Sequence, residues 1–98
     1  MQSVPLRERI EYLLQLDDDE LRGSHAAELE DVVQCGFAAV HSGELWIRHV
    51  ARARETTPER AADLDSELAR SRESVAEVRE RVSALHARAQ KLGVGAPG

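Results

Sequence analysis

The chain has 98 residues, of which 42% are hydrophobic and 32% charged, with a formal net charge of −5. Because 14 of the hydrophobic residues are alanine, only 26 large apolar side chains remain, a thin supply for the core of a monomer. The acidic balance argues against nonspecific nucleic-acid binding, and a single cysteine excludes an internal disulfide. No apolar run approaches the ~20 residues of a membrane span, and the start lacks a signal-peptide core. We therefore expect a cytoplasmic protein.

A first, short helix is predicted over about 4–16. Ser3 is a suitable N-cap and Pro5 is tolerated in the opening turn. Large aliphatic residues then recur on one helical face: Leu6, Ile10, Leu13 and Leu14. The carboxylates of residues 17–20 and the following Gly23 indicate that the helix ends there.

A second helix is predicted over about 24–55, with Ser24 as its N-cap. One heptad phase runs through both of its glycines: Leu29, Val33, Gly36, Val40, Gly43, Ile47 and Val50. A loop at Ser42–Gly43 would have no reason to keep that phase, so we expect one continuous helix. A break there is the alternative, since Ser-Gly is also common in turns. The tetrapeptide RGSH at 22–25 resembles a vector-derived junction, which leaves open whether the segment before it belongs with the rest.

A third helix is predicted over about 58–92, with Thr57 as N-cap and Pro58 in its first turn. Its apolar residues form a narrow two-column seam typical of a coiled coil: Ala61, Leu64, Leu68, Val75, Val78, Val82, Leu85, Ala89 and Leu92. Gly93 is expected to end the helix, and residues 93–98 to form a disordered tail.

These elements predict a single all-α domain over 1–92. The two long helices have similar lengths and a short joint, so they should form an antiparallel coiled-coil hairpin. The first helix should pack on the broad apolar face of the second, but it is too short to cover that face completely. We therefore predict a homodimeric helical bundle with the glycine face at or near the interface. The expected interface residues are Leu29, Val33, Gly36, Phe37, Val40, Gly43, Trp46, Ile47 and Val50.

One basic cluster is a candidate surface for a protein partner: Arg48, His49, Arg52 and Arg54. It could grip an acidic partner, or it could pair with the acidic stretch 16–21, LDDDEL, of the same chain or of a second subunit. We favour the second interpretation, because the opposite charge is supplied by the same small protein.

The sequence offers little for catalysis or cofactor binding. His41, Glu44 and His49 lack a further ligand for a metal site, and Cys35 lies in mid-helix with no neighbouring base. We expect no enzyme activity, no cofactor and no metal. The predicted function is a dimeric protein-interaction module, such as an adaptor, an anti-sigma-like regulator or an assembly factor. The alternative is a helical protein that binds an apolar or nucleotide ligand near Phe37 and Trp46.

Overall fold

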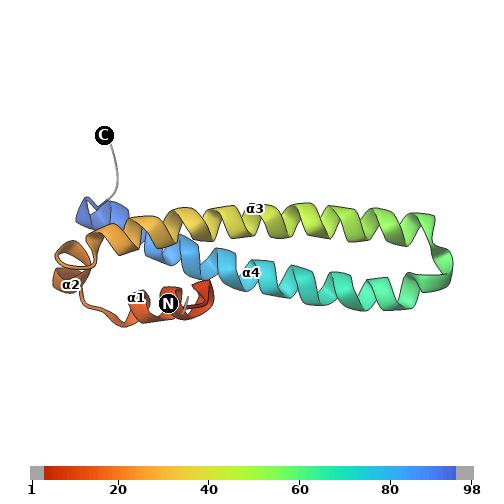
Figure 1. Cartoon of the computed structure of the whole chain (residues 1–98), viewed down its shortest axis with the longest axis horizontal. Helices are drawn as coiled ribbons and strands as arrows, with labels where there is room; N and C mark the ends of the chain where they lie inside the picture. The colour runs from red at the N-terminus through yellow and green to blue at the C-terminus, as the bar shows by residue number, and fades with distance from the viewer. Residues whose placement is uncertain (1–3, 95–98) are drawn as a thin grey trace.

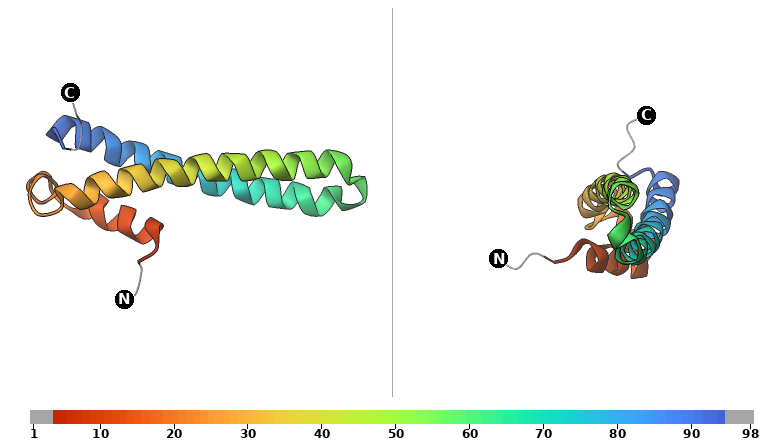
Figure 2. Two further views of the ribbon diagram at one scale, coloured as in Figure 1. Left: turned by 45° about the horizontal axis from the view of Figure 1, so that its top comes forward. Right: turned by 90° about the vertical axis from the view of Figure 1, so that its right-hand side faces the viewer.

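A computed structural model of the chain describes residues 4–94. In chain order its helices are α1 (Leu6–Gln15), α2 (Asp18–Arg22), α3 (Ala26–Thr56), the 3-10 turn η1 (Pro58–Arg60) and α4 (Ala61–Leu92). The two long helices pack antiparallel along a body that measures 54 × 32 × 21 Å (Figure 1). Viewed along this body, α1 lies below the pair formed by α3 and α4 (Figure 2). The predicted all-α hairpin with a short N-terminal helix is confirmed.

The continuous path of α3 through its two glycines is confirmed, and α4 explains why glycine stands there. A Cβ atom on Gly36 would lie 2.4 Å from Val82 Cγ2, and one on Gly43 would lie 2.4 Å from Val75 Cγ2. Both distances are below any real contact, so the glycines allow α4 to approach the α3 backbone closely. The partner of the glycine face is therefore α4 of the same chain.

The acidic stretch after α1 forms a helix that the sequence analysis missed. Asp17 is the N-cap of α2, and its side chain accepts a hydrogen bond from the Glu20 backbone amide at 2.8 Å. Asp18 and Asp19 then occupy the first turn, where the positive end of the helix dipole favours carboxylates. The first helix ends at Gln15, just before these carboxylates, as expected, but the carboxylates also begin a new helix.

The predicted N-cap Ser24 is wrong by one residue, whereas Thr57 holds its predicted N-cap position without a side-chain bond. His25, instead of Ser24, precedes α3, and the Ser24 hydroxyl pairs with His25 Nδ1 at 3.2 Å. Thr57 precedes η1 but forms no side-chain capping bond, because the chain enters α4 through a 3-10 turn. The third predicted cap, Ser3, lies outside the described residues.

The end of α4 is a Schellman motif. Gly93 takes the left-handed φ of 73°, and its amide bonds to the Gln90 carbonyl at 3.2 Å. The Val94 amide bonds to the Ala89 carbonyl at 2.8 Å, and the Val94 side chain packs against the core. Gly93 and Val94 thus belong to the folded body instead of the expected tail, while residues 95–98 lie outside the described part.

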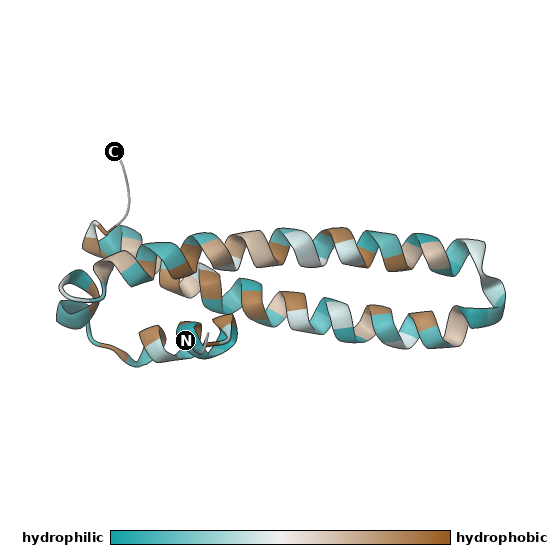
Figure 3. Ribbon diagram, in the orientation of Figure 1, coloured by the Kyte–Doolittle hydropathy of each residue, from teal (hydrophilic) through white to brown (hydrophobic). Residues whose placement is uncertain are grey.

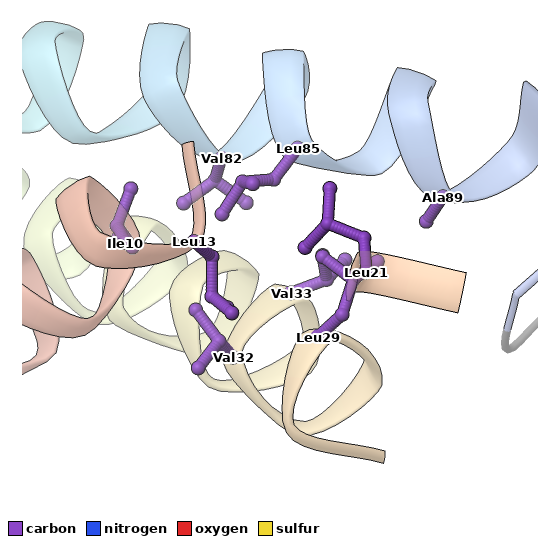
Figure 4. Packing of buried hydrophobic residues seen from close by; sticks show 9 residues of the cluster. All are labelled: Ile10, Leu13, Leu21, Leu29, Val32, Val33, Val82, Leu85 and Ala89. Atoms are coloured by element: carbon purple, nitrogen blue, oxygen red, sulfur yellow. The ribbon is translucent and has the colours of Figure 1, made fainter. Parts of the chain in front are cut away.

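The core sits at the end of the hairpin that α1 and α2 cover. Figure 4 shows side chains from all four α-helices meeting in one cluster: Ile10, Leu13, Leu21, Leu29, Val32, Val33, Val82, Leu85 and Ala89. Leu21 and Leu29, on either side of the tetrapeptide at 22–25, are both fully buried in it. The segments before and after that tetrapeptide therefore form one core.

The molecule divides into a covered half and an uncovered half. We call residues 4–41 with 76–94 the base, and residues 42–75 the arm, which consists of the second half of α3, η1 and the first half of α4. In Figure 1 no third helix accompanies the arm. Only Val50 and Leu68 are buried hydrophobic residues there, and brown apolar positions alternate with teal polar ones along it (Figure 3).

Candidate functional site

The hairpin presents one face to α1 in the base. From α3, Val32 is fully buried beneath α1, and Asp31 accepts a hydrogen bond from Arg9 at 2.9 Å. From α4, Arg81 pairs with Glu11 of α1 at 2.7 Å. This face therefore combines an apolar column on α3 with a charged column on α4.

Two further α4 side chains mark the ends of α1. Arg88 donates to the Leu16 carbonyl at 2.9 Å, just beyond the C-terminus of α1. At the other end, Arg7 pairs with Glu77 at 3.3 Å. Beyond Glu77, toward the tip of the hairpin, the face is uncovered.

The uncovered part of this face continues the same columns. Trp46 follows Val32 by two heptads on α3, and Glu67 precedes Arg81 by two heptads on α4. Arg70 likewise precedes Glu77 by one heptad. The place that α1 fills in the base is therefore an open groove on the arm, and Trp46 lies in it.

Polar side chains surround Trp46 in this groove, while the residue is 49% exposed. Its indole Nε1 donates to Glu67 Oε1 at 3.3 Å, and its ring lies 5.6 Å from the ring of His49. Glu67 also accepts hydrogen bonds from Arg70 at 2.8 Å and from the Ser71 hydroxyl at 3.3 Å. The indole is thus oriented by α4 but not covered by it.

Two hollows meet at Trp46 along the groove. One, of about 370 Å³, reaches toward the base between Gly43 and Ser74. The other, of about 620 Å³, reaches toward the tip between Ala53 and Leu64. Trp46, Glu67 and Arg70 line both. We call these two hollows together the Trp46 groove.

The structure divides the expected interface residues into two groups. Five are buried within the single chain: Leu29, Val33, Gly36, Val40 and Val50. Gly43 and Ile47 are half-buried, and only Phe37 and Trp46 remain exposed. The expectation that the glycines face a second chain is wrong in this structure, because Val75 and Val82 of α4 occupy that space.

Phe37 and Trp46 do not share a site. They are nine residues apart, which at about 100° per residue places them on opposite sides of α3. Phe37 contacts His86 edge to face, with ring centroids 5.4 Å apart, whereas Trp46 contacts His49 and Glu67. A ligand pocket lined by both aromatic residues is therefore not formed.

The predicted basic cluster is split as well. Arg54 pairs with Asp65 of α4, with Nη2 and Oδ2 3.2 Å apart, and this hydrogen bond raises the pKa of Arg54. The His49 ring lies beside the Trp46 ring at a tilt of 31°. Arg48 and Arg52 are exposed and form no ion pair within residues 4–94.

The acidic stretch does not neutralise this cluster within the chain, because it lies at the opposite end of the hairpin. Asp18 instead pairs with Arg88 at 2.9 Å, and this hydrogen bond holds the pKa of Asp18 below its ordinary value. Asp19 pairs with Arg22 one turn away. The interpretation of the basic cluster as the intrachain partner of LDDDEL is therefore wrong.

No polar or charged side chain between residues 4 and 94 is buried, and the shifted pKa values belong to exposed ion pairs of Arg9, Asp18 and Arg54. Over the same residues, no three metal-ligating side chains gather to hold an ion. Of the three side chains that the sequence analysis considered and rejected as metal ligands, Glu44 pairs with Arg79. Cys35 is exposed, with Sγ 3.8 Å from Asp31 Oδ1.

Sequence reasoning missed Glu67 and Arg70, the α4 side chains that frame Trp46. Their signal was present in the heptad, since both stand next to the seam of the third helix. What was missing was the register of α4 against α3.

No helix in the described part of the chain is long and apolar enough to cross a bilayer. A scan of protein-family models and searches of curated proteins and solved structures gave no match.

Proposed function

We propose that this protein is a non-enzymatic interaction module that acts as a homodimer and associates through the Trp46 groove. One observation carries the proposal. The same face of the hairpin is buried under α1 in the base and open on the arm, where half of a tryptophan side chain meets water. An exposed tryptophan within a polar rim is typical of a protein-interaction surface, and tryptophan is enriched among residues that dominate binding energy.

The adaptor or regulatory role of such a dimer requires a second surface that dimerisation leaves free. Another face of α3 carries three residues that are spaced three and four positions apart and do not line the Trp46 groove: Leu45, Arg48 and Arg52. Leu45 is 48% exposed. We assign the binding of an acidic protein partner to this ridge, because arginine forms strong charge-assisted hydrogen bonds with carboxylates.

A matched pair of variants tests the dimer. Trp46 and Leu45 are neighbours with almost equal exposure, 49% and 48%, but only Trp46 lies in the groove. By light scattering at micromolar concentration we expect the parent chain and Leu45→Ser to be dimeric and Trp46→Ser to be monomeric. In the parent, the emission of the single tryptophan should shift to the blue as concentration rises, because association removes water from the indole. A monomeric parent chain, or a Trp46→Ser variant that still dimerises, would contradict the proposal.

A further inference from the structure

We infer that the Trp46 groove is occupied by the arm of a second copy, which runs in the opposite direction and stops against α1. The two arms then form an antiparallel four-helix bundle in which α3 packs on the partner's α3 and α4 on the partner's α4. This inference rests on the proposed dimer and specifies its geometry. It is carried by the position of α1, by the sizes of the side chains in the groove and by the charge of the arm.

The position of α1 determines the direction of the partner. If two hairpins packed with their tips pointing the same way, the α1 helices of both copies would lie between them. The outer surface of α1 carries Glu8, Glu11 and Gln15 beside one exposed aromatic side chain, Tyr12, which already contacts His25 edge to face and through its hydroxyl. Two such acidic surfaces would be a poor interface core. With the tips pointing in opposite directions, only the uncovered arms overlap, and each α1 lies beyond the partner's tip.

The lengths agree with this arrangement. The face is free from the level of Gly43 and Val75, which are in contact, to the end of α3 at Thr56. The 15 residues 42–56 span about 22 Å at 1.5 Å per residue. Two helices, each about 10 Å across, give a face of about 450 Å² per copy, or about 900 Å² in total. This area lies below the range of stable interfaces and within that of weak, transient ones.

Side-chain size is complementary about the two-fold axis. The axis passes through the middle of the arm, near His49 of α3 and Leu68 of α4. Trp46 of one copy then lies opposite Ala53 of the other, a large side chain facing a small one. Ala53 lines the tip-side hollow, which leaves space for the incoming indole.

The charge of the arm permits a second copy to bind there. Residues 42–75 carry seven acidic and six basic side chains, whereas the base carries eleven acidic and seven basic ones. Contact between two arms therefore avoids the repulsion that contact between two bases would produce. About the same axis, Arg70 of one copy lies opposite Glu67 of the other, and Ser74 lies opposite Asp63. The groove is thus complementary to itself in charge.

A charge exchange between two variants tests this pairing. The two-fold axis creates two pairs between position 70 of one copy and position 67 of the other. In the Arg70→Glu variant each pair consists of two carboxylates, and in the Glu67→Arg variant each pair consists of two guanidinium groups. We expect each variant alone to associate at least tenfold more weakly than the parent, and an equimolar mixture to form heterodimers within a few-fold of the parent affinity. Arg72→Glu is the control, since Arg72 lines a hollow on the other side of the hairpin. Circular dichroism should show the same helix content in all variants.

A cross-link tests the position of the axis. In a Cys35→Ser background, His49→Cys should give a disulfide-linked dimer on mild oxidation, whereas Leu45→Cys, on the outer face, should remain monomeric under denaturing conditions.

The outcomes separate the two proposals. A monomeric parent chain overturns both. The antiparallel geometry alone is overturned if the parent dimerises through Trp46 but the two further tests fail. In that case the charge variants do not recover affinity on mixing, and the His49→Cys variant does not cross-link.

Discussion

The base and the arm of this hairpin are built from the same two helices, yet they differ in how they bury their apolar residues. In the base, α1 and α2 close the bundle and nine side chains form a core. In the arm, two helices pack only on each other, and a pair of helices cannot enclose a core. The heptad continues unchanged from one half to the other, so the difference comes from what covers the hairpin. An uncovered continuation of a covered face is therefore where an interaction surface is to be expected.

The largest difference between the base and the arm is expected in the loss of unfolding free energy when a buried leucine is replaced by alanine. Leu13 is fully buried among residues of α3 and α4, so Leu13→Ala should lower the free energy of unfolding by about 2–5 kcal/mol. Leu68 in the arm is 6% exposed, but its surroundings are open and can collapse into the space. Leu68→Ala should therefore cost less than about 2 kcal/mol.

Urea denaturation followed by circular dichroism measures both values. A Trp46→Ser background keeps association from contributing to the unfolding free energy. Equal losses for the two variants would show that the arm is packed as firmly as the base.

The two glycines of α3 give a second and finer comparison. A Cβ on Gly36 would meet both methyl groups of Val82, at 2.4 and 3.0 Å, and Val82 is fully buried and stiff about χ1. Gly36→Ala should lower the free energy of unfolding by about 1–2 kcal/mol, since overpacking exceeds the ~1 kcal/mol gained from helix propensity. At Gly43 only one methyl of the half-buried Val75 is too close, and the next contact is at 3.8 Å. Gly43→Ala should therefore be near neutral, within about 1 kcal/mol.

Thermal and urea unfolding of the two alanine variants, in the same Trp46→Ser background, gives this difference directly. A Gly43→Ala variant as unstable as Gly36→Ala would mean that the arm helices cannot move apart to admit a methyl group.

The smallest expected effect is a pH dependence confined to the base. The hydrogen bond from Arg88 holds the pKa of Asp18 below its ordinary value of about 3.9, so the folded state favours the carboxylate. This contribution to stability is complete above the ordinary pKa and is lost as the pH falls through the lowered value in the folded state. The parent should lose more unfolding free energy between about pH 5 and pH 2 than Asp18→Asn does.

The size of this effect should be small, because the carboxylate is exposed to solvent. Urea denaturation at a series of pH values provides the measurement, with Asp19→Asn as a neighbouring control. Identical pH profiles for the parent and Asp18→Asn would show that the contact between Asp18 and Arg88 does not contribute to the unfolding free energy.

Sequence reasoning succeeded where the pattern is long and failed where it is short. The heptad through Gly36 and Gly43 extends over about two turns on either side, so one continuous helix was predictable. The five residues of α2 have no such period, and their carboxylates suit the start of a helix as well as they oppose its end. The opposite positions of Phe37 and Trp46 could have been obtained from their spacing alone.

The sequence by itself determined the three main helical segments, the turn at Thr57 and the columns of each helix that must face an apolar neighbour. Only the tertiary structure decided which neighbour each column receives: α4 for the glycines, α1 for Val32, and none within the chain for Trp46. The physical reason is that periodicity is a local property of one helix. Its partner depends on the length of α1 and on the register of the hairpin, which are set by contacts between residues 32 to 70 positions apart.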